Sequence, residues 1–213
     1  MPLYHLHGLG CNLTATLVAG AQIVCMHMFT PGLAIECFRE ARPSWYSAVP
    51  TMHLGIVNAL VESGTDSSAD TLKFIRNCSA ALLPSAARQL EEAHGAGCKV
   101  LPTYGMTESL PIASNPRFGL RSLRSVGLEA GPALHVIDDC EQVVRVGQEG
   151  EVCVKGANVM RGYEYRSHMD GDANLEAFTA SRWLRTGDRG YLDENDYLCL
   201  TGRSKEIINR GGE

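Results

Sequence analysis

The stretch "SWYSAVPTMHLGIVNALVES" (residues 44–63) decides the fold, because an extended apolar run is followed directly by a helical pattern. Its first six residues are rich in apolar and aromatic side chains, which favours a strand. Pro50 stands where the first helical residue is expected, and Leu54, Val57 and Val61 recur at helical spacing. The stretch therefore predicts a buried strand that leads straight into a helix.

The same alternation continues on both sides of this stretch. A helix is expected from Thr30, which suits the N-cap, with Pro31 at the first helical position. Strands and helices that alternate with short connections predict an α/β fold: part of a parallel sheet covered by helices on both faces. Such sheets bind ligands beyond the carboxyl ends of their strands. The further elements expected are strands at 21–26, 72–77 and 98–103, and helices at 12–20 and 84–95.

The pattern changes after about residue 120. Short apolar runs alternate with turn residues in "LHVID" (134–138), "EGEVCVKG" (149–156) and "RGYLDENDYLCLTG" (189–202). This pattern predicts a smaller antiparallel β unit. We therefore expect residues 1–120 to form the α/β part and residues 121–201 a small β-rich subdomain.

Composition excludes several classes of protein. The 213 residues carry a formal net charge of −5, whereas nucleic-acid-binding domains are usually basic. The eight cysteines are scattered with no Cys-x-x-Cys pair, so reduced core thiols are expected. No signal peptide is apparent, and polar residues and a proline interrupt the apolar stretch 13–35. We expect no nucleic-acid partner, no membrane span and a cytoplasmic location, with the peroxisome as the alternative.

One strand ends in an unusual group of residues. In "LPTYGMTESL" (101–110) a glycine, a hydroxyl and a carboxylate follow an apolar run. One interpretation is a solvated turn, or Thr107 and Glu108 capping a following helix. The other is a loop that holds phosphate and a metal ion. The position beyond a parallel strand favours the ligand loop.

Several motifs together resemble the adenylate-forming, AMP-binding superfamily, and within it the acyl-CoA synthetases. The resemblance is closest to the oxalate–CoA ligase and 4-coumarate–CoA ligase-like group. Each motif alone is moderately specific, but their order and spacing are highly specific. The motifs are "PLYHLHGL" (2–9), "NCSAAL" (77–82), "YGMTES" (104–109), "GEVCVKGANVMRGY" (150–163) and "WLRTGDRGYLDENDYLCLTGRSKEIINRGGE" (183–213).

The resemblance implies an ATP-dependent acid–CoA ligase. A carboxylate attacks the α-phosphorus of ATP to give acyl-AMP and pyrophosphate, and the thiol of coenzyme A then displaces AMP. The partners implied are ATP, Mg²⁺, coenzyme A and a small carboxylic acid, with oxalate as one candidate. The site must supply cations and hydrogen-bond donors to the phosphates.

The resemblance also assigns the nucleotide site. Tyr104 and Gly105 border the adenine, and Thr107 donates to the α-phosphate. Glu108 binds Mg²⁺, for which an oxygen ligand is suitable. The ribose is held by Asp188 and Arg203. For Asp188 an ordinary β-turn beside a glycine is the alternative.

For the acid, the resemblance points to His5 beside the carboxylate. It also points to Ser79 with Ala80 and Ala81, which would form the floor of the acid pocket. A His-x-His metal site is disfavoured because no third ligand is near; we expect His7 to face away and to be structural. Pro111 replaces a histidine typical of the oxalate-like group, and this puts oxalate itself in doubt.

The resemblance places Lys205 at a hinge and Gly212 at the coenzyme A tunnel, so residues 202–213 would begin a further domain. A phosphate loop is expected before residue 1, and a C-terminal lid domain after residue 213. We therefore interpret the chain as a middle fragment that is inactive alone. The alternatives are a catalytically incomplete remnant that binds a nucleotide or acyl group, and a structural remnant without a ligand.

Overall fold

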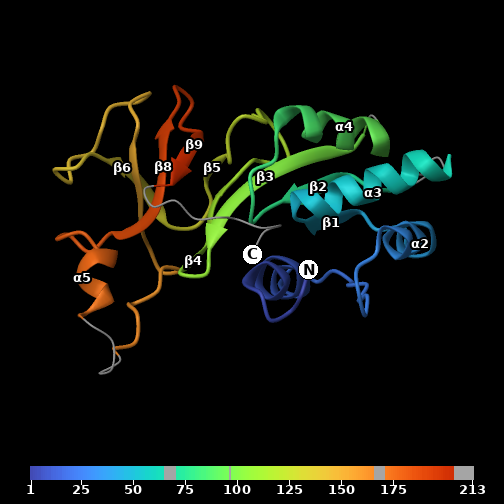
Figure 1. The fold of residues 1–213 in the computed structure, drawn as a ribbon, viewed down its shortest axis with the longest axis horizontal. Coiled ribbons are helices and arrows are strands. Elements are labelled where there is room, and N and C mark those ends of the chain that lie inside the picture. Colours follow the sequence, from blue (N-terminus) through green and yellow to red (C-terminus); the bar gives the residue numbers. More distant parts are fainter. Residues whose placement is uncertain (65–70, 96, 166–170, 204–213) are drawn as a thin grey trace. The chain divides into compact units, whose positions relative to one another are not determined.

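The computed structural model describes residues 1–64, 71–95, 97–165 and 171–203 (Figure 1). The chain forms two compact units. Among the described residues, the first contains residues 1–103 and 116–124, and the second contains residues 104–115 and 125–203. The expected division at residues 120 and 201 stays a prediction.

A parallel sheet forms the centre of the first unit. Its strands are β1 (Trp45–Ala48), β2 (Phe74–Asn77) and the first part of β3 (Lys99–Met106). Trp45 pairs with Phe74, and Phe74 pairs with Lys99, both in parallel register. The three expected strands and their parallel direction are thus confirmed.

Helices pack against this sheet and against one another. They are α2 (Pro31–Ala41), α3 (Pro50–Ser63) and α4 (Pro84–His94), each with proline in its first turn as expected. The Thr30 hydroxyl accepts a hydrogen bond from the Leu33 amide at 3.2 Å, which confirms the N-cap. One apolar core joins α4 to the sheet, and a second joins α2 to α3. The first includes the fully buried residues Ile75, Leu90 and Val100, and the second includes Ile35, Ile56 and Leu60.

The buried face of α3 differs from the expected one. Leu54 is 37% exposed and Val61 is 73% exposed, so the expected stripe is wrong. The buried positions are His53, Ile56 and Leu60, which have the same spacing shifted by one residue. Periodicity set the spacing correctly, but the packing of α3 against α2 set the phase.

The N-terminal region differs most from expectation. Residues 7–14 form a π-helix, η1 (His7–Thr14), which continues into α1 (Ala15–Val18) and ends at Gly20 with φ +67°. The predicted helix at 12–20 is therefore largely confirmed, but it starts earlier. The predicted strand at 21–26 is wrong, because no described strand pairs with it and Val24 is 55% exposed.

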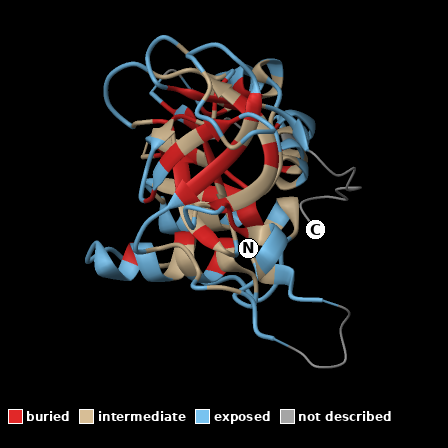
Figure 2. Ribbon diagram, turned by 90° about the vertical axis from the view of Figure 1, so that its left-hand side faces the viewer, coloured by how far each residue is buried: buried red, intermediate tan, exposed pale blue. Residues whose placement is uncertain are grey.

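An antiparallel sheet dominates the second unit, as predicted. Its order is β6 (Ala133–Ile137), β7 (Gly150–Lys155), β8 (Leu184–Leu192) and β9 (Leu198–Arg203). The unit also contains β4 (Ser109–Ser114), β5 (Leu128–Glu129) and the short helix α5 (Ala173–Ala177). Buried residues concentrate on the strands (Figure 2). The core includes Ile112, Val152, Val154, Leu184 and Leu198.

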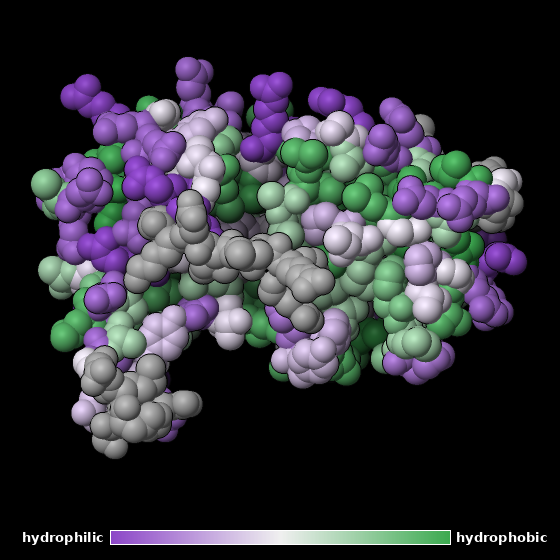
Figure 3. Space-filling view, viewed as in Figure 1, coloured by the Kyte–Doolittle hydropathy of each residue, from purple (hydrophilic) through white to green (hydrophobic). Residues whose placement is uncertain are grey.

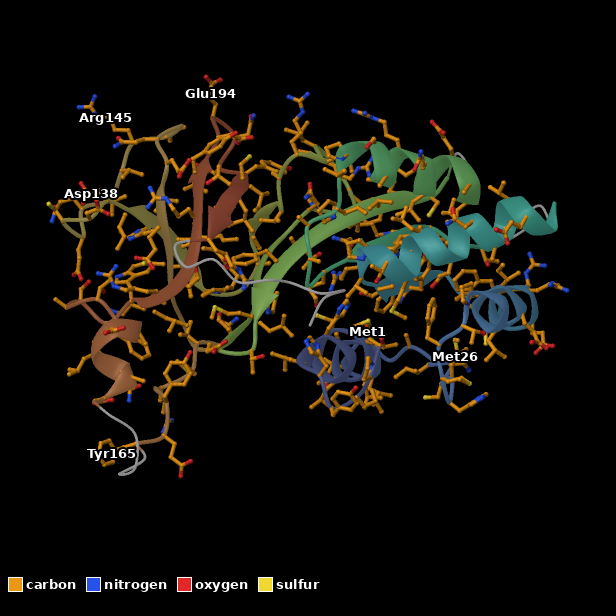
Figure 4. All side chains as sticks on the ribbon, in the orientation of Figure 1. Met1, Met26, Asp138, Arg145, Tyr165 and Glu194 are labelled. Atoms are coloured by element: carbon orange, nitrogen blue, oxygen red, sulfur yellow. The ribbon has the colours of Figure 1, made fainter. Side chains whose placement is uncertain are left out.

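The turns of this sheet are polar. Figure 3 shows hydrophilic side chains gathered around these turns. Asp138, Arg145 and Glu194 are labelled in Figure 4, where each projects from a turn between strands. Within the described residues, no helix combines the length and the apolar character that crossing a membrane requires. All eight cysteines are unpaired, and five of them are buried.

Candidate active site

The "YGMTES" segment forms a β-hairpin. β3 continues through Met106, Thr107 and Glu108 make the turn, and β4 follows directly. The helix-cap interpretation of Thr107 and Glu108 is therefore wrong, because a strand follows them. Thr107 is exposed and Glu108 is half-buried, so both lie where a ligand can reach them. A Cβ atom on Gly105 would lie 2.5 Å from Leu110 Cδ1, so the Leu110 side chain covers this glycine.

Asp188 is the buried centre of a hydrogen-bond group in the second unit. Tyr104 Oη donates to Asp188 Oδ2 at 2.5 Å, and Arg203 Nε donates to Asp188 Oδ1 at 2.8 Å. Asp188 is 6% exposed. The β8–β9 register places it opposite Arg203. Tyr104 lies 84 positions before Asp188 and Arg203 lies 15 positions after it, and both meet at its carboxylate.

The interpretation of Asp188 as an ordinary turn residue is wrong. Asp188 lies inside β8, and the preceding Gly187 takes φ +73° within the strand. A glycine adopts this left-handed conformation without strain. The Thr186 hydroxyl accepts from the Asp188 amide at 3.1 Å. The Gly187 conformation and the hydrogen bond to Thr186 therefore fix the backbone just before the Asp188 carboxylate.

Charge and burial keep the Tyr104 phenol protonated. Burial raises its pKa well above the usual value, and the negative charge of Asp188 and their hydrogen bond raise it further. Tyr104 is consequently a permanent donor to Asp188 near neutral pH. Arg203 supplies the cation that partners the buried carboxylate, and such charge-assisted bonds are stronger than neutral ones.

A second polar contact holds Glu108. Tyr163 Oη donates to Glu108 Oε1 at 2.7 Å, and the Met160 amide donates to the Glu108 carbonyl at 2.8 Å. Asn174 fixes the Tyr163 backbone by accepting from its amide at 2.6 Å and donating to its carbonyl at 3.0 Å. Burial, the hydrogen bond to Glu108 and the Glu108 charge raise the pKa of Tyr163 to about 12. Tyr163 ends the fourth motif, but its contact with Glu108 was not predicted.

The residues present suit a magnesium ion shared with phosphates. The Glu108 carboxylate uses one oxygen for Tyr163, and its second oxygen has no partner among the described residues. No group of three His, Cys, Asp or Glu side chains that could hold a metal occurs in the described parts of the chain. Mg²⁺ commonly takes one or two carboxylates, with phosphate oxygens and waters completing its shell. A single carboxylate at the hairpin turn fits that mode of binding.

In the first unit, His7 rather than His5 contacts Ser79. His7 Nδ1 lies 3.1 Å from Ser79 Oγ, and His7 Nε2 lies 2.5 Å from Ser47 Oγ. His5 Nδ1 accepts from the His7 amide at 3.1 Å. His7 starts the π-helix η1 and, contrary to expectation, does not face away from Ser79. His7 was expected to be structural, and neither its spacing nor its neighbours in sequence revealed its two serine partners.

The remaining expected residues are placed as follows. Ala80 is half-buried next to Ser79, and Ala81 is exposed. Pro111 lies in β4, and its carbonyl accepts from Asn158 Nδ2 at 2.9 Å. Lys205 and Gly212 lie outside the described residues. Among the expected residues, the structure brings together Tyr104, Asp188 and Arg203 at one place, and it joins Ser79 to a histidine.

Comparison with known families agrees with this geometry. The family model described as "AMP-binding enzyme" matches residues 1–164, which is more than half of the chain. The chain belongs to the AMP-binding enzyme family. The predicted superfamily and its α/β fold are therefore confirmed.

Three relatives of this AMP-binding chain are acid–CoA ligases by name. Oxalate–CoA ligases from Arabidopsis thaliana and Saccharomyces cerevisiae are each 37% identical to it, and the sulfoacetate–CoA ligase of Cupriavidus necator is 36% identical. Each match covers 100% of this chain but only 41%, 38% and 40% of the respective relative. The chain thus spans about two fifths of the length of these relatives.

Solved structures in the family share its fold. ATP-bound MatB from Rhodopseudomonas palustris superimposes with a TM-score of 0.84 at 28% identity, over 100% of this chain and 41% of that one. A malonyl-CoA ligase complex with methylmalonyl-CoA and AMP gives a TM-score of 0.84 at 27% identity, over 100% of this chain and 45% of that one.

Proposed function

We propose that this chain carries nucleotide-binding and acid-binding residues of an ATP-dependent acid–CoA ligase that acts on a small polar carboxylic acid. The observation that carries the proposal is the Asp188 group, in which Tyr104 and Arg203 meet one buried carboxylate. Membership of the AMP-binding family supports it.

Asp188 is suited to hold a ribose. Each carboxylate oxygen can accept about two hydrogen bonds, and Tyr104 and Arg203 use one on each oxygen. The positions left over can accept from two vicinal hydroxyls. Because Tyr104 and Arg203 fix the carboxylate before the nucleotide arrives, binding costs little reorganisation.

The hairpin turn is suited to the phosphates. The exposed Thr107 hydroxyl can donate to an α-phosphate oxygen, and Glu108 is the residue that would hold Mg²⁺. The ion would neutralise phosphate charge as a carboxylate approaches the α-phosphorus. Tyr163 keeps one Glu108 oxygen in place, so the carboxylate is oriented before it meets the ion.

The acid is assigned to Ser79, His5 and the small residues Ala80 and Ala81. A hydroxyl and an imidazole suit a short polar acid better than a long apolar chain. In the first half-reaction, the acid carboxylate attacks the α-phosphorus and pyrophosphate leaves. In the second, the coenzyme A thiol attacks the acyl carbonyl and AMP leaves. Lys205 is proposed as a hinge residue and Gly212 as a residue of the coenzyme A tunnel.

The proposal is tested in a chimera in which this chain replaces the matching residues of the Arabidopsis oxalate–CoA ligase. Thioester formation with oxalate, acetate, a 4-coumarate-like acid and a C12 acid is measured, with the parent enzyme as the control for folding. We expect ATP-dependent and coenzyme A-dependent product with a short acid preferred. Preference for the C12 acid would overturn the assignment of the acid pocket.

The same chimera separates the ligase from a protein that only binds nucleotide. Glu108→Gln and Thr107→Val should lower turnover while leaving the fold intact. Loss of one transition-state donor typically lowers turnover by roughly 10²–10³-fold. A folded chimera that binds ATP but yields no thioester with any acid would favour the binding-only alternative.

A further inference from the structure

A chain of three side chains in the first unit connects β1, η1 and Ser79, which lies two residues after the end of β2. Ser47 Oγ lies 2.5 Å from His7 Nε2, and His7 Nδ1 lies 3.1 Å from Ser79 Oγ. His7 is 2% exposed and Ser47 is 8% exposed. Both nitrogens of one buried imidazole are therefore committed to two serine hydroxyls.

The backbone at both ends of this chain is unusual. His7 begins a π-helix, a rare element that often marks functional sites. Ser79 takes φ +72°, a left-handed conformation that is uncommon for a residue other than glycine and persists only where its surroundings impose it. The following residue of η1, Gly8, lies so close to the Pro2 carbonyl that a Cβ atom there would collide with it. The π-helix at His7 and the left-handed backbone at Ser79 thus accompany the contact between these two side chains.

Burial fixes the charge of the imidazole. It lowers the pKa of His7 to about 4, and the positive charge of Arg76 lowers it further. At neutral pH His7 has one N–H and one lone pair, so one serine must donate to it and the other must accept.

The two distances indicate which serine donates. Hydrogen bonds from hydroxyl donors are shorter than those from N–H donors, for which separations up to about 3.2 Å are usual. The short contact of 2.5 Å suits Ser47 O–H donating to Nε2, and the longer one of 3.1 Å suits Nδ1–H donating to Ser79 Oγ. His7 is then the Nδ1–H tautomer, and Ser79 accepts from it.

This direction has a consequence for an acid. A serine that accepts from His7 turns its own O–H toward other acceptors, and a carboxylate is a strong acceptor. In the reverse direction, Ser79 would point its proton at Nδ1 and present lone pairs to an anion, which would repel it.

We propose that His7 is a positioning residue that orients the Ser79 hydroxyl as a donor to a carboxylate substrate, with Ser47 fixing the tautomer of His7. This inference rests on the proposed function, which puts Ser79 in the acid site. His7 and Ser47 act through Ser79 and need not touch the acid.

The direct test of the tautomer uses the 213-residue chain itself. Long-range ¹H–¹⁵N NMR distinguishes the two imidazole tautomers, with His7→Gln used to assign the signal. We expect Nδ1–H in the wild type and a loss of that preference in Ser47→Ala. The Nε2–H tautomer in the wild type would overturn the inference, whatever the activity of the enzyme.

The kinetic test uses the chimera described above. Ser47→Ala should raise KM for the acid by roughly 3- to 10-fold, the usual effect of one hydrogen bond, while KM for ATP stays unchanged. Ser47→Thr keeps the hydroxyl and serves as the matched control. His7→Asn, whose amide can replace Nδ1–H, should retain more acid affinity than His7→Gln, whose amide reaches toward Ser47.

A double-mutant cycle separates orientation from folding. In a Ser79→Ala background, Ser47→Ala should have no further effect on KM for the acid, because its target hydroxyl is gone. Additive effects, or equal changes in KM for ATP and acid, would show a merely structural role. If Ser79→Ala leaves KM for the acid unchanged, the assignment of the acid site fails. The NMR result then still decides the direction of the His7 contacts.

Discussion

The Asp188 group and the His7 group are both built around one buried polar side chain, but they arise in different ways. Asp188 lies on a paired strand, and the register of β8 and β9 places Arg203 opposite it. His7 lies in a π-helix, and its partners come from a strand and a residue with positive φ. The Asp188 group was expected because its residues resemble family motifs, whereas the His7 contacts depend on irregular local geometry that the sequence pattern does not encode.

The largest expected difference between the two units is in acid stability. Burial lowers the pKa of His7 to about 4, of His53 to about 3 and of His94 to about 4, all in the first unit. Neighbouring histidines contribute to the shift of His53. In the described part of the second unit the one histidine, His135, is only half-buried.

These histidines give the sign of the pH dependence. The pKa values of these histidines are lower in the folded state than the value near 6.5 in the unfolded state. The folded protein therefore has its full stability above pH 6.5, where the histidines are neutral in both states. That stability is lost as pH falls toward 4. At pH 5 the loss is about 2 kcal/mol for each histidine.

Each unit contains one tryptophan that can report on it. Trp45 stacks on Phe74 in the first unit, and Trp183 stacks on His135 in the second. In Trp183→Phe, Trp45 fluorescence follows the urea unfolding of the first unit. We expect the free energy of unfolding of this unit to fall steeply between pH 7 and pH 5. The Trp183 signal in Trp45→Phe should change less. His53→Gln should reduce the pH dependence of the first unit's stability, whereas the exposed control His27→Gln should not. Equal pH dependence of the two units, or equal effects of the two substitutions, would contradict this account.

The strand register of the second unit can be broken at one glycine. A Cβ atom on Gly190 would collide with the Cys199 carbonyl oxygen across β8 and β9, whereas nothing lies within 4 Å of a Cβ on Gly202. Gly190→Ala should destabilise the unit by about 2–3 kcal/mol and separate Asp188 from Arg203. Gly202→Ala is the matched control and should stay within about 0.5 kcal/mol of wild type. Similar melting temperatures for the two variants would show that the register is not held at this position.

A smaller effect is expected at the N-terminus of α2, where sequence pattern and structure agree. Thr30→Ala removes the acceptor for the Leu33 amide and should cost about 1 kcal/mol. Thr30→Ser keeps the hydroxyl and should be close to wild type. Denaturant unfolding of the three proteins compares them, and equal stability of the alanine and serine variants would show that the cap contributes nothing.

The smallest expected effect concerns the choice of acid. Pro111→His restores a donor for a second carboxylate, and an anion left without a partner is costly to bury. In the chimera, kcat/KM for oxalate relative to acetate should rise by roughly 3- to 10-fold, as expected for one added hydrogen bond. Pro111→Ala is the control for loss of the proline ring. A rise of the same size in Pro111→Ala would remove the histidine from the explanation.

Much of the fold was readable from the sequence. Proline at helix starts, Thr30 as an N-cap and alternating apolar runs predicted α2, α3, α4 and the parallel strands. The phase of α3 was not readable, because which of two adjacent stripes is buried depends on its neighbours. The segment at 21–26 has the composition of a strand, but among the described residues it has no partner.

The candidate site was predicted in part, through the family resemblance and not through residue pattern. The nucleotide residues Tyr104, Asp188 and Arg203 were expected, and the structure brings them together. Tyr163 and His7 were missed as partners of Glu108 and Ser79, because their contacts join segments far apart in the sequence. A π-helix leaves no clear periodic signal, so the position of His7 could not be derived from residue spacing.

The most direct test of the account is nucleotide binding at Asp188. Isothermal titration calorimetry of ATP with the chimera compares Asp188→Ala with Glu194→Ala, a change to an exposed carboxylate in the adjacent turn. Circular dichroism confirms that both variants are folded. Loss of a charge-assisted hydrogen bond costs about 1.5–3 kcal/mol, so Asp188→Ala should weaken ATP binding by roughly 10- to 150-fold. Glu194→Ala should bind like wild type. If a folded Asp188→Ala variant binds ATP as tightly as wild type, the carboxylate serves only to hold Tyr104 and Arg203, and the nucleotide site lies elsewhere.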